Sequence, residues 1–82
     1  MISVEAQSKH TAEQIVDRAV RFFGPEGVGL ETVDQSECCV RFEGGGGFVT
    51  LTLESEEEEK RTRVSVQGRE FDWQIRKFLQ EV

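Results

Sequence analysis

The sequence predicts an α+β domain: a curved antiparallel sheet of about five strands with two helices packed on one face. Three observations support this prediction. Between residues 28 and 66 apolar and polar side chains alternate, as they do in half-buried antiparallel strands. Segments 11–23 and 71–82 instead repeat their apolar residues at helical spacing. Because a short alternating stretch precedes the first helix, we expect the order β-α-β-β-β-β-α in one domain, residues 1–82.

The first strand and the start of the first helix are both visible in the sequence. Residues 2–6 alternate, with Ile2, Val4 and Ala6 on one side of the strand. Thr11 is followed three residues later by Gln14, which predicts a capping box. The helix therefore starts directly after Thr11.

The first helix has an apolar face and a clear end. Gly24 and Pro25 stop it, and we expect the glycine to adopt a left-handed conformation there. The residues of the apolar face are Ala12, Ile15, Val16, Ala19, Phe22 and Phe23.

Four further strands and a second helix follow. The inward-facing positions of the strands are Val28, Leu30 and Thr32, then Cys38, Val40 and Phe42, then Val49, Leu51 and Leu53, and finally Thr62, Val64 and Val66. The second helix begins after Gly68, with Glu70 and Asp72 in its first turn. Its apolar stripe consists of Phe71, Ile75, Phe78, Leu79 and Val82.

The opening segment ISVEAQSKHTAEQIVDRAVRFFG, a strand, a short turn and a helix, is similar to the start of helix-grip proteins. The element order resembles those polyketide cyclases and START-type lipid carriers in reduced form, and also the TATA-box-binding-protein topology. The helix-grip resemblance implies an apolar ligand between the last helix and the sheet. Its lining would be Val40, Phe42, Leu51, Val64, Phe71, Ile75 and Phe78.

Four consecutive glycines, Gly44–Gly47, raise the question of a phosphate-binding loop. Such loops need a helix N-terminus that converges on the anion, but here one alternating strand precedes the glycines and another follows. We interpret the glycines as a hairpin turn. A hairpin symmetric about them places Glu43 opposite Phe48, Arg41 opposite Thr50, and Cys39 opposite Thr52.

The acidic run from Glu54 to Lys60 is interpreted as the solvated tip of the next hairpin, where like charges repel and discourage strand stacking. It lacks the spacing of a calcium loop, and no Cys/His cluster has zinc spacing, so no metal or cofactor is expected.

Adjacent cysteines on a strand leave from opposite faces, so we expect Cys38 to be buried and Cys39 to be a partly exposed thiol. A disulfide between them would distort a strand and is disfavoured. The single histidine, His10, lies before the first helix, and nothing in the sequence brings it near Cys39. Since no hydrolase, zinc-protease or dinucleotide motif is present either, an enzyme is disfavoured.

Two features fit a binding role. Trp73 lies opposite the apolar stripe of its helix, where it either folds over Lys77 as a cation–π contact or anchors a partner. The outer sheet face combines short hydroxyl side chains with arginine, and either faces water or packs against a copy of itself. The residues expected to make contacts there are Arg41, Phe48, Thr50, Thr52, Arg63 and Ser65.

Charge limits the partners. Sixteen acidic residues against ten basic ones give a net charge of −6, which opposes duplex DNA and anionic lipid. Only Phe48 could stack a base of single-stranded nucleic acid. No stretch is apolar enough for a membrane span and no secretion signal is recognisable, so a cytoplasmic location is expected.

The sequence therefore favours a small non-catalytic binding module that self-associates, for example as a homodimer, through the outer sheet face or a sheet edge. The alternative is a carrier of a small apolar ligand, as the helix-grip resemblance implies.

Overall fold

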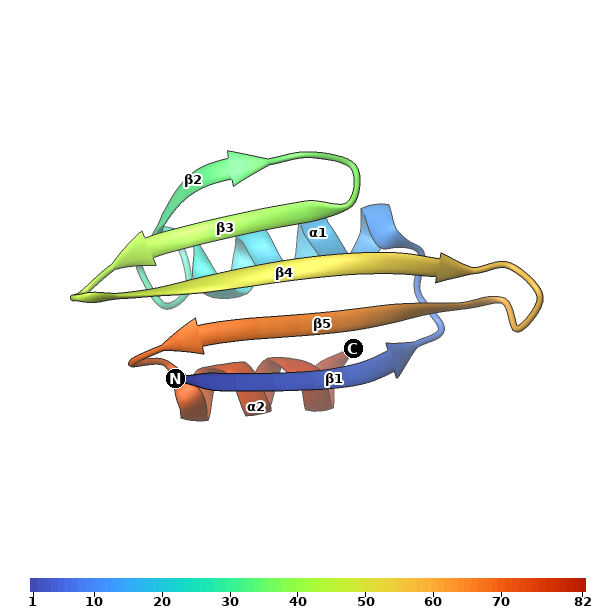
Figure 1. Ribbon diagram of the computed structural model, residues 1–82. Helices are drawn as coiled ribbons and strands as arrows, with labels where there is room; N and C mark the ends of the chain where they lie inside the picture. Colours follow the sequence, from blue (N-terminus) through green and yellow to red (C-terminus); the bar gives the residue numbers. More distant parts are fainter.

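The computed structural model describes residues 1–82 and confirms an α+β fold with two helices and one open five-stranded antiparallel sheet. The elements follow the predicted order: β1 (Ile2–Ser8), α1 (Ala12–Phe23), β2 (Glu31–Gln35), β3 (Cys39–Gly44), β4 (Gly47–Glu56), β5 (Arg61–Arg69) and α2 (Asp72–Glu81). Across the sheet the order is β1-β5-β4-β3-β2, so the first strand pairs with the last (Figure 1).

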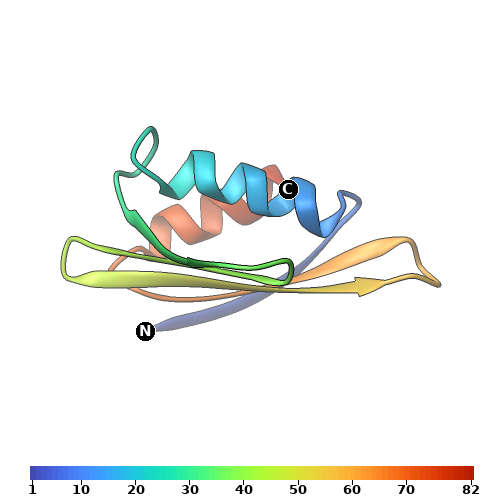
Figure 2. The same cartoon turned by 90° about the horizontal axis from the view of Figure 1, so that it is seen from above.

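Both helices cover the same face of the sheet and leave the other face bare (Figure 2). The sequence alternation explains this arrangement for β3, β4 and β5, where the inward positions are mostly apolar and the outward ones mostly polar. The predicted strand face Val28, Leu30 and Thr32 is not one, because β2 begins only at Glu31, after Val28 and Leu30, and its apolar residue Val33 is exposed. One core cluster fills the space between helices and sheet, made of Ile2, Ile15, Val16, Ala19, Phe23, Leu30, Val40, Phe42, Val49, Leu51, Leu53, Val64, Val66, Phe71, Ile75 and Phe78.

Aromatic rings join the two helices to the sheet. Phe23, the last residue of α1, has its ring centroid 5.2 Å from that of Phe78 in α2 and 5.5 Å from that of Phe42 in β3. Phe22 packs edge-on against Phe23 at 4.9 Å. Tilted and edge-on rings at these separations are favourable arrangements for aromatic pairs.

The capping box at the start of α1 is confirmed. The Gln14 backbone N–H donates to Thr11 Oγ1 at 3.2 Å, and the Thr11 backbone N–H donates to Gln14 Oε1 at 3.0 Å. Two backbone donors that the helix itself leaves without partners are thereby satisfied.

Replacing Thr11 with alanine is therefore expected to lower the free energy of unfolding by about 1 kcal/mol, since the Gln14 N–H loses its acceptor. Urea denaturation followed by circular dichroism measures this loss. Thr11→Ser keeps the hydroxyl and should retain most of the stability. An alanine variant as stable as the wild type would contradict the capping role.

Two details at helix ends differ from expectation. Gly24 is not left-handed, since its φ is −73°; it is needed because a side chain there would collide with the backbone carbonyl of Val20. Glu70 precedes α2 and does not join its first turn. It takes a φ of 76°, while Phe71 occupies the N-cap position of α2.

The hairpin registers agree with the sequence. Glu43 pairs with Phe48, Arg41 with Thr50 and Cys39 with Thr52. Gly45 and Gly46 form the turn with φ values of 58° and 83°, which is the reason glycine is needed there. Of the acidic segment, only Glu57–Lys60 form the tip of the β4–β5 hairpin, because β4 continues through Glu56 and pairs there with Arg61.

Two buried polar side chains form hydrogen bonds that link the segments near the end of β1. Ser8 Oγ donates to the Val82 carbonyl at 3.0 Å and accepts from the His10 backbone N–H at 3.1 Å. Thr62 Oγ1 donates to the His10 carbonyl at 2.8 Å. His10 is thus held through its backbone at the junction of β1 and α1.

Candidate functional site

The outer face of the sheet, which no helix covers, carries the residues predicted to bind. Strand pairing arranges them in rows that cross the sheet. One row runs Glu5, Ser65, Thr52, Cys39, and the next runs Ser3, Gln67, Thr50, Arg41, Asp34. Thr50, Thr52 and Ser65 therefore do form a central strip of short hydroxyl side chains.

Arg41 and Phe48 contact each other on this face. The guanidinium carbon of Arg41 lies 4.5 Å above the centroid of the Phe48 ring. The same guanidinium donates to Thr50 Oγ1 at 3.0 Å and to Glu43 Oε2 at 2.9 Å. Three neighbours thus hold the Arg41 side chain on the outer face of the sheet. There it covers surface that a second sheet would have to contact.

The guanidinium of Arg63 forms ion pairs with carboxylates from two neighbouring strands. Its guanidinium lies 3.2 Å from Glu5, 3.4 Å from Glu54 and 3.4 Å from Glu56. These carboxylates are partly in water, so each pair contributes little to stability by itself. Together the three carboxylates offset the positive charge of Arg63. A nucleic acid would need such a positive charge on this face to bind its phosphates.

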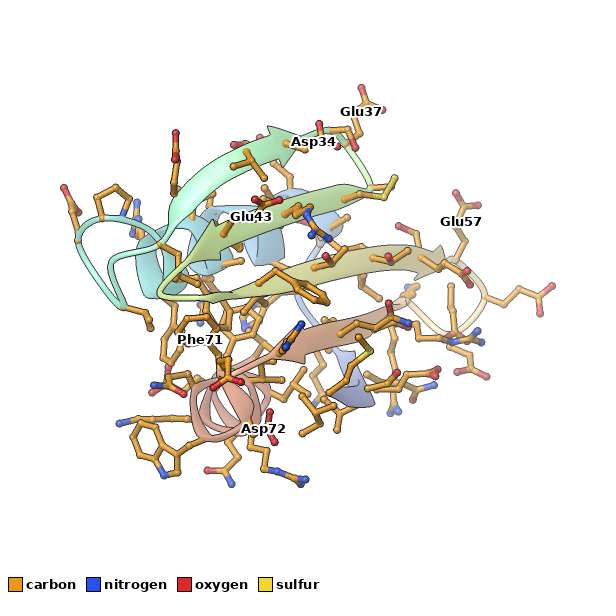
Figure 3. The ribbon with its side chains drawn as sticks, turned by 60° about the vertical axis from the view of Figure 1, so that its left-hand side comes forward. Asp34, Glu37, Glu43, Glu57, Phe71 and Asp72 are labelled. Carbon is orange, nitrogen blue, oxygen red and sulfur yellow. A yellow bond between two sulfur atoms is a disulfide. The ribbon has the colours of Figure 1, made fainter.

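Acidic side chains also lie at the margin of the sheet. Figure 3 shows Asp34, Glu37 and Glu43 along β2, β3 and the turn between them, with Glu57 at the tip of the β4–β5 hairpin. No group of three or more His, Cys, Asp or Glu side chains is arranged to hold a metal ion.

Trp73 is 66% exposed on α2, and the Lys77 ammonium lies 5.1 Å from its ring centroid. The cation–π contact expected from the sequence is therefore present, and it leaves most of the indole in water. Trp73 also lines a shallow depression with Met1 and Arg69, at the start of β1. Met1 itself is 88% exposed, so both large apolar residues that line this depression are largely in water.

The residues of the alternative ligand site are packed against one another. Val40, Phe42, Leu51, Val64, Phe71, Ile75 and Phe78 all belong to the buried core cluster. Five depressions on the surface are each lined by at most one of these residues. Phe78 is the one that reaches such a depression, a groove between α1 and α2 that also contains Arg18 and Arg21.

The prediction for the two cysteines was wrong. Cys38 and Cys39 are joined by a disulfide, drawn in yellow at the turn between β2 and β3 in Figure 3. Cys38 is exposed, not buried, because β3 begins only at Cys39 and Cys38 belongs to the turn. Adjacent residues point to opposite faces of a sheet only when both belong to the strand, so this rule does not place the Cys38 side chain.

A further feature, which the sequence alone did not single out, is the free edge of β1. β1 pairs with β5 along its whole length from Ile2 to Ser8, and its other side has no neighbouring strand. Val4 and Ala6 are only half-buried there. Their alternation was recognised in the sequence, but their place at the edge follows from the strand order.

No helix of the protein is both long and apolar enough to cross a membrane. No family model, characterised protein or solved structure matches the chain.

Proposed function

We propose that the protein is a small non-catalytic interaction module that self-associates through the edge of β1. In this proposal β1 of one copy pairs antiparallel with β1 of a second copy, and the two sheets join into one. The observation that carries the proposal is the contrast between the two edge strands of the sheet. β2 has features that prevent pairing with a further strand, whereas β1 lacks most of them.

The β2 edge has features that prevent strand pairing. β2 has only five residues, and its register with β3 shifts between Thr32 and Asp34. Glu31 and Asp34 add negative charge, so a second copy would be repelled. Short length, a bulge and charge are the means by which proteins protect sheet edges.

The β1 edge has none of these protections except one charge. Its seven residues pair with β5 without a bulge, and it contains neither lysine nor proline. Its only charged residue, Glu5, is already paired with Arg63 at 3.2 Å. Backbone N–H and C=O groups on the free side of β1 are therefore available to a second strand.

One antiparallel register suits the side chains of β1 best. With Val4 at a two-fold axis, Val4 lies opposite its own copy, and Ile2 lies opposite the second copy's Ala6. Apolar side chains then face apolar ones, and Glu5 lies opposite Ser3 and not opposite a second glutamate. Cross-strand pairs of this kind stabilise a sheet, whereas directly opposed like charges destabilise it.

Helix α2 extends the proposed contact beyond the backbone. It lies behind β1 in Figure 1, and its Phe78 faces α1, with 5.5 Å between the Phe78 and Phe22 ring centroids. Leu79 lies about 100° further around the helix, is half-buried and, like Val4, packs against the core cluster. A two-fold axis at β1 brings the α2 helices of the two copies side by side, with Trp73 as a contact at the rim.

Self-association is tested by light scattering and sedimentation from micromolar to several hundred micromolar protein. We expect the wild type to form a dimer and Val4→Lys to weaken it at least tenfold, because two like charges then lie opposite each other at the axis. The matched control is Thr50→Asp with Thr52→Asp, which alters the outer face and should leave the dimer intact. Circular dichroism establishes that both variants are folded.

The other outcomes identify the alternatives. A wild type that remains monomeric at several hundred micromolar overturns self-association. Dissociation by the Thr50 and Thr52 changes with an unaffected Val4→Lys variant moves the interface to the outer face. An apolar small molecule that co-purifies reproducibly, detected by native mass spectrometry, favours the carrier.

A further inference from the structure

The disulfide between Cys38 and Cys39 is poorly suited to a purely structural role. It joins adjacent residues, so it closes almost no loop and removes little entropy from the unfolded chain. It also lies at the surface, where Cys38 is exposed and Cys39 half-buried. Exposed disulfides are the ones that other thiols reach and reduce most readily.

The turn that carries the cysteines is held by other bonds as well. The Ser36 backbone N–H donates to the Cys39 carbonyl at 2.8 Å, and Ser36 Oγ also reaches this oxygen at 3.4 Å. The Leu53 N–H of β4 donates to the Cys38 carbonyl at 2.8 Å. Because these bonds do not involve the sulfur atoms, the backbone of the turn keeps them when the disulfide opens.

We propose that Cys38 and Cys39 form a reversible dithiol–disulfide site that exchanges with low-molecular-weight thiols. In the first step a thiolate attacks Sγ of the exposed residue Cys38, forms a mixed disulfide there, and displaces Cys39 as a thiolate. A second small thiolate then attacks the small-molecule sulfur of this mixed disulfide. That step releases Cys38 as a thiolate and forms the disulfide of the small thiol. Two small thiols are oxidised, and the two protons they lose end on the cysteines.

Opening the bridge also has a structural consequence in β3. Cys39 pairs with Thr52, so the next pair of the ladder is Cys38 with Leu53. One of its two hydrogen bonds, Leu53 N–H to the Cys38 carbonyl, is already made, while the Cys38 N–H donates no backbone bond. With the sulfurs separate, the side chains of Cys38 and Cys39 are free to leave from opposite faces, as in a regular strand. Reduction therefore extends β3 by Cys38.

This site is independent of the proposed dimer contact. Cys39 lies in β3, and β4 and β5 separate β3 from β1 in the sheet. A dimer that fails to form leaves the exchange chemistry untouched, and an inert disulfide leaves the β1 edge untouched.

The exchange is tested on the native protein with reduced and oxidised glutathione at graded ratios. Acid quenching, trapping with N-ethylmaleimide and intact mass measurement then count the free thiols. We expect both thiols to appear together as the ratio becomes reducing and to disappear when it is reversed. Cys38→Ser and Cys39→Ser should each lose this two-thiol transition and retain only a mixed disulfide with glutathione.

Two results would overturn the site. In the first, the native protein shows no trapped thiol at the most reducing ratio although the denatured protein shows two. In the second, both thiols are trapped at every ratio, which means that the bridge does not form.

The extension of β3 is measured separately by amide hydrogen exchange. We expect the Cys38 N–H to exchange at least tenfold more slowly in the reduced protein, because it gains the Leu53 carbonyl as acceptor. The double variant Cys38→Ser/Cys39→Ser should show the same protection without reductant. Equal exchange in the oxidised and reduced states would refute the extension.

Discussion

Replacing Phe23 with alanine is expected to lower the free energy of unfolding by about 3–5 kcal/mol, the range for removing a fully buried aromatic ring. Phe23 has no exposed surface and contacts aromatic rings from β3 and α2. A chain of this size has a total stability of about 4–12 kcal/mol. The variant should therefore be largely unfolded in moderate urea and melt at a much lower temperature.

Equilibrium urea denaturation followed by fluorescence of Trp73 and by circular dichroism measures this effect. Phe22→Ala is the matched control, since the neighbouring ring is only half-buried and lies at the groove between the helices. It should lose less than half as much stability as Phe23→Ala. Equal losses for the two variants would show that Phe23 does not join the helices to the sheet.

Replacing Gly68 with alanine is expected to destabilise the protein by about 2–3 kcal/mol through overpacking. Gly68 lies on the inner face of β5, where an added methyl group would collide with Cδ1 of Ile75 in α2. It would also lie 2.9 Å from the Phe48 carbonyl oxygen. Helix α2 packs closely on the sheet at this point because the glycine has no side chain, so the methyl group pushes the helix away.

A double-mutant cycle with Ile75→Val tests this explanation, because valine lacks the Cδ1 atom that collides. Ile75→Val alone should cost about 1 kcal/mol for the lost methyl group. In the Gly68→Ala background the same change should restore stability, with a coupling energy of at least about 1 kcal/mol. Strict additivity of the two losses would show that the glycine and the isoleucine do not compete for this space.

The sequence predicted those parts of the fold that depend on neighbours along the chain. Thr11 and Gln14 are three residues apart, so their capping box follows from helix geometry alone. The register of Arg41 with Thr50 follows from a hairpin centred on the glycines. Burial of Val40, Phe42, Val49, Leu51, Leu53, Val64 and Val66 follows from alternation, because the face of a strand is a local property.

The parts that the sequence did not predict depend on distant contacts or on a boundary of one residue. Alternation shows that β1 has an inner face, but only the pairing with β5 makes it an edge strand. The fate of Cys38 depended on whether β3 begins at residue 38 or 39, and element boundaries are less certain than element types. The contact of Arg63 with Glu5 was also missed, since the pairing of β1 with β5 is known only with the full sheet order. The partner of Arg41, Glu43, lies two residues away on the same strand and was within reach of the sequence pattern.

Pairing of the first strand with the last also constrains how the protein is made on the ribosome. Ile2 must find Gly68, 66 residues later in the chain. At about 5–20 residues per second, β1 emerges several seconds before its partner is synthesised. The local β3–β4 and β4–β5 hairpins can form during translation, whereas β1 waits as an unpaired, alternating segment that chaperones can bind.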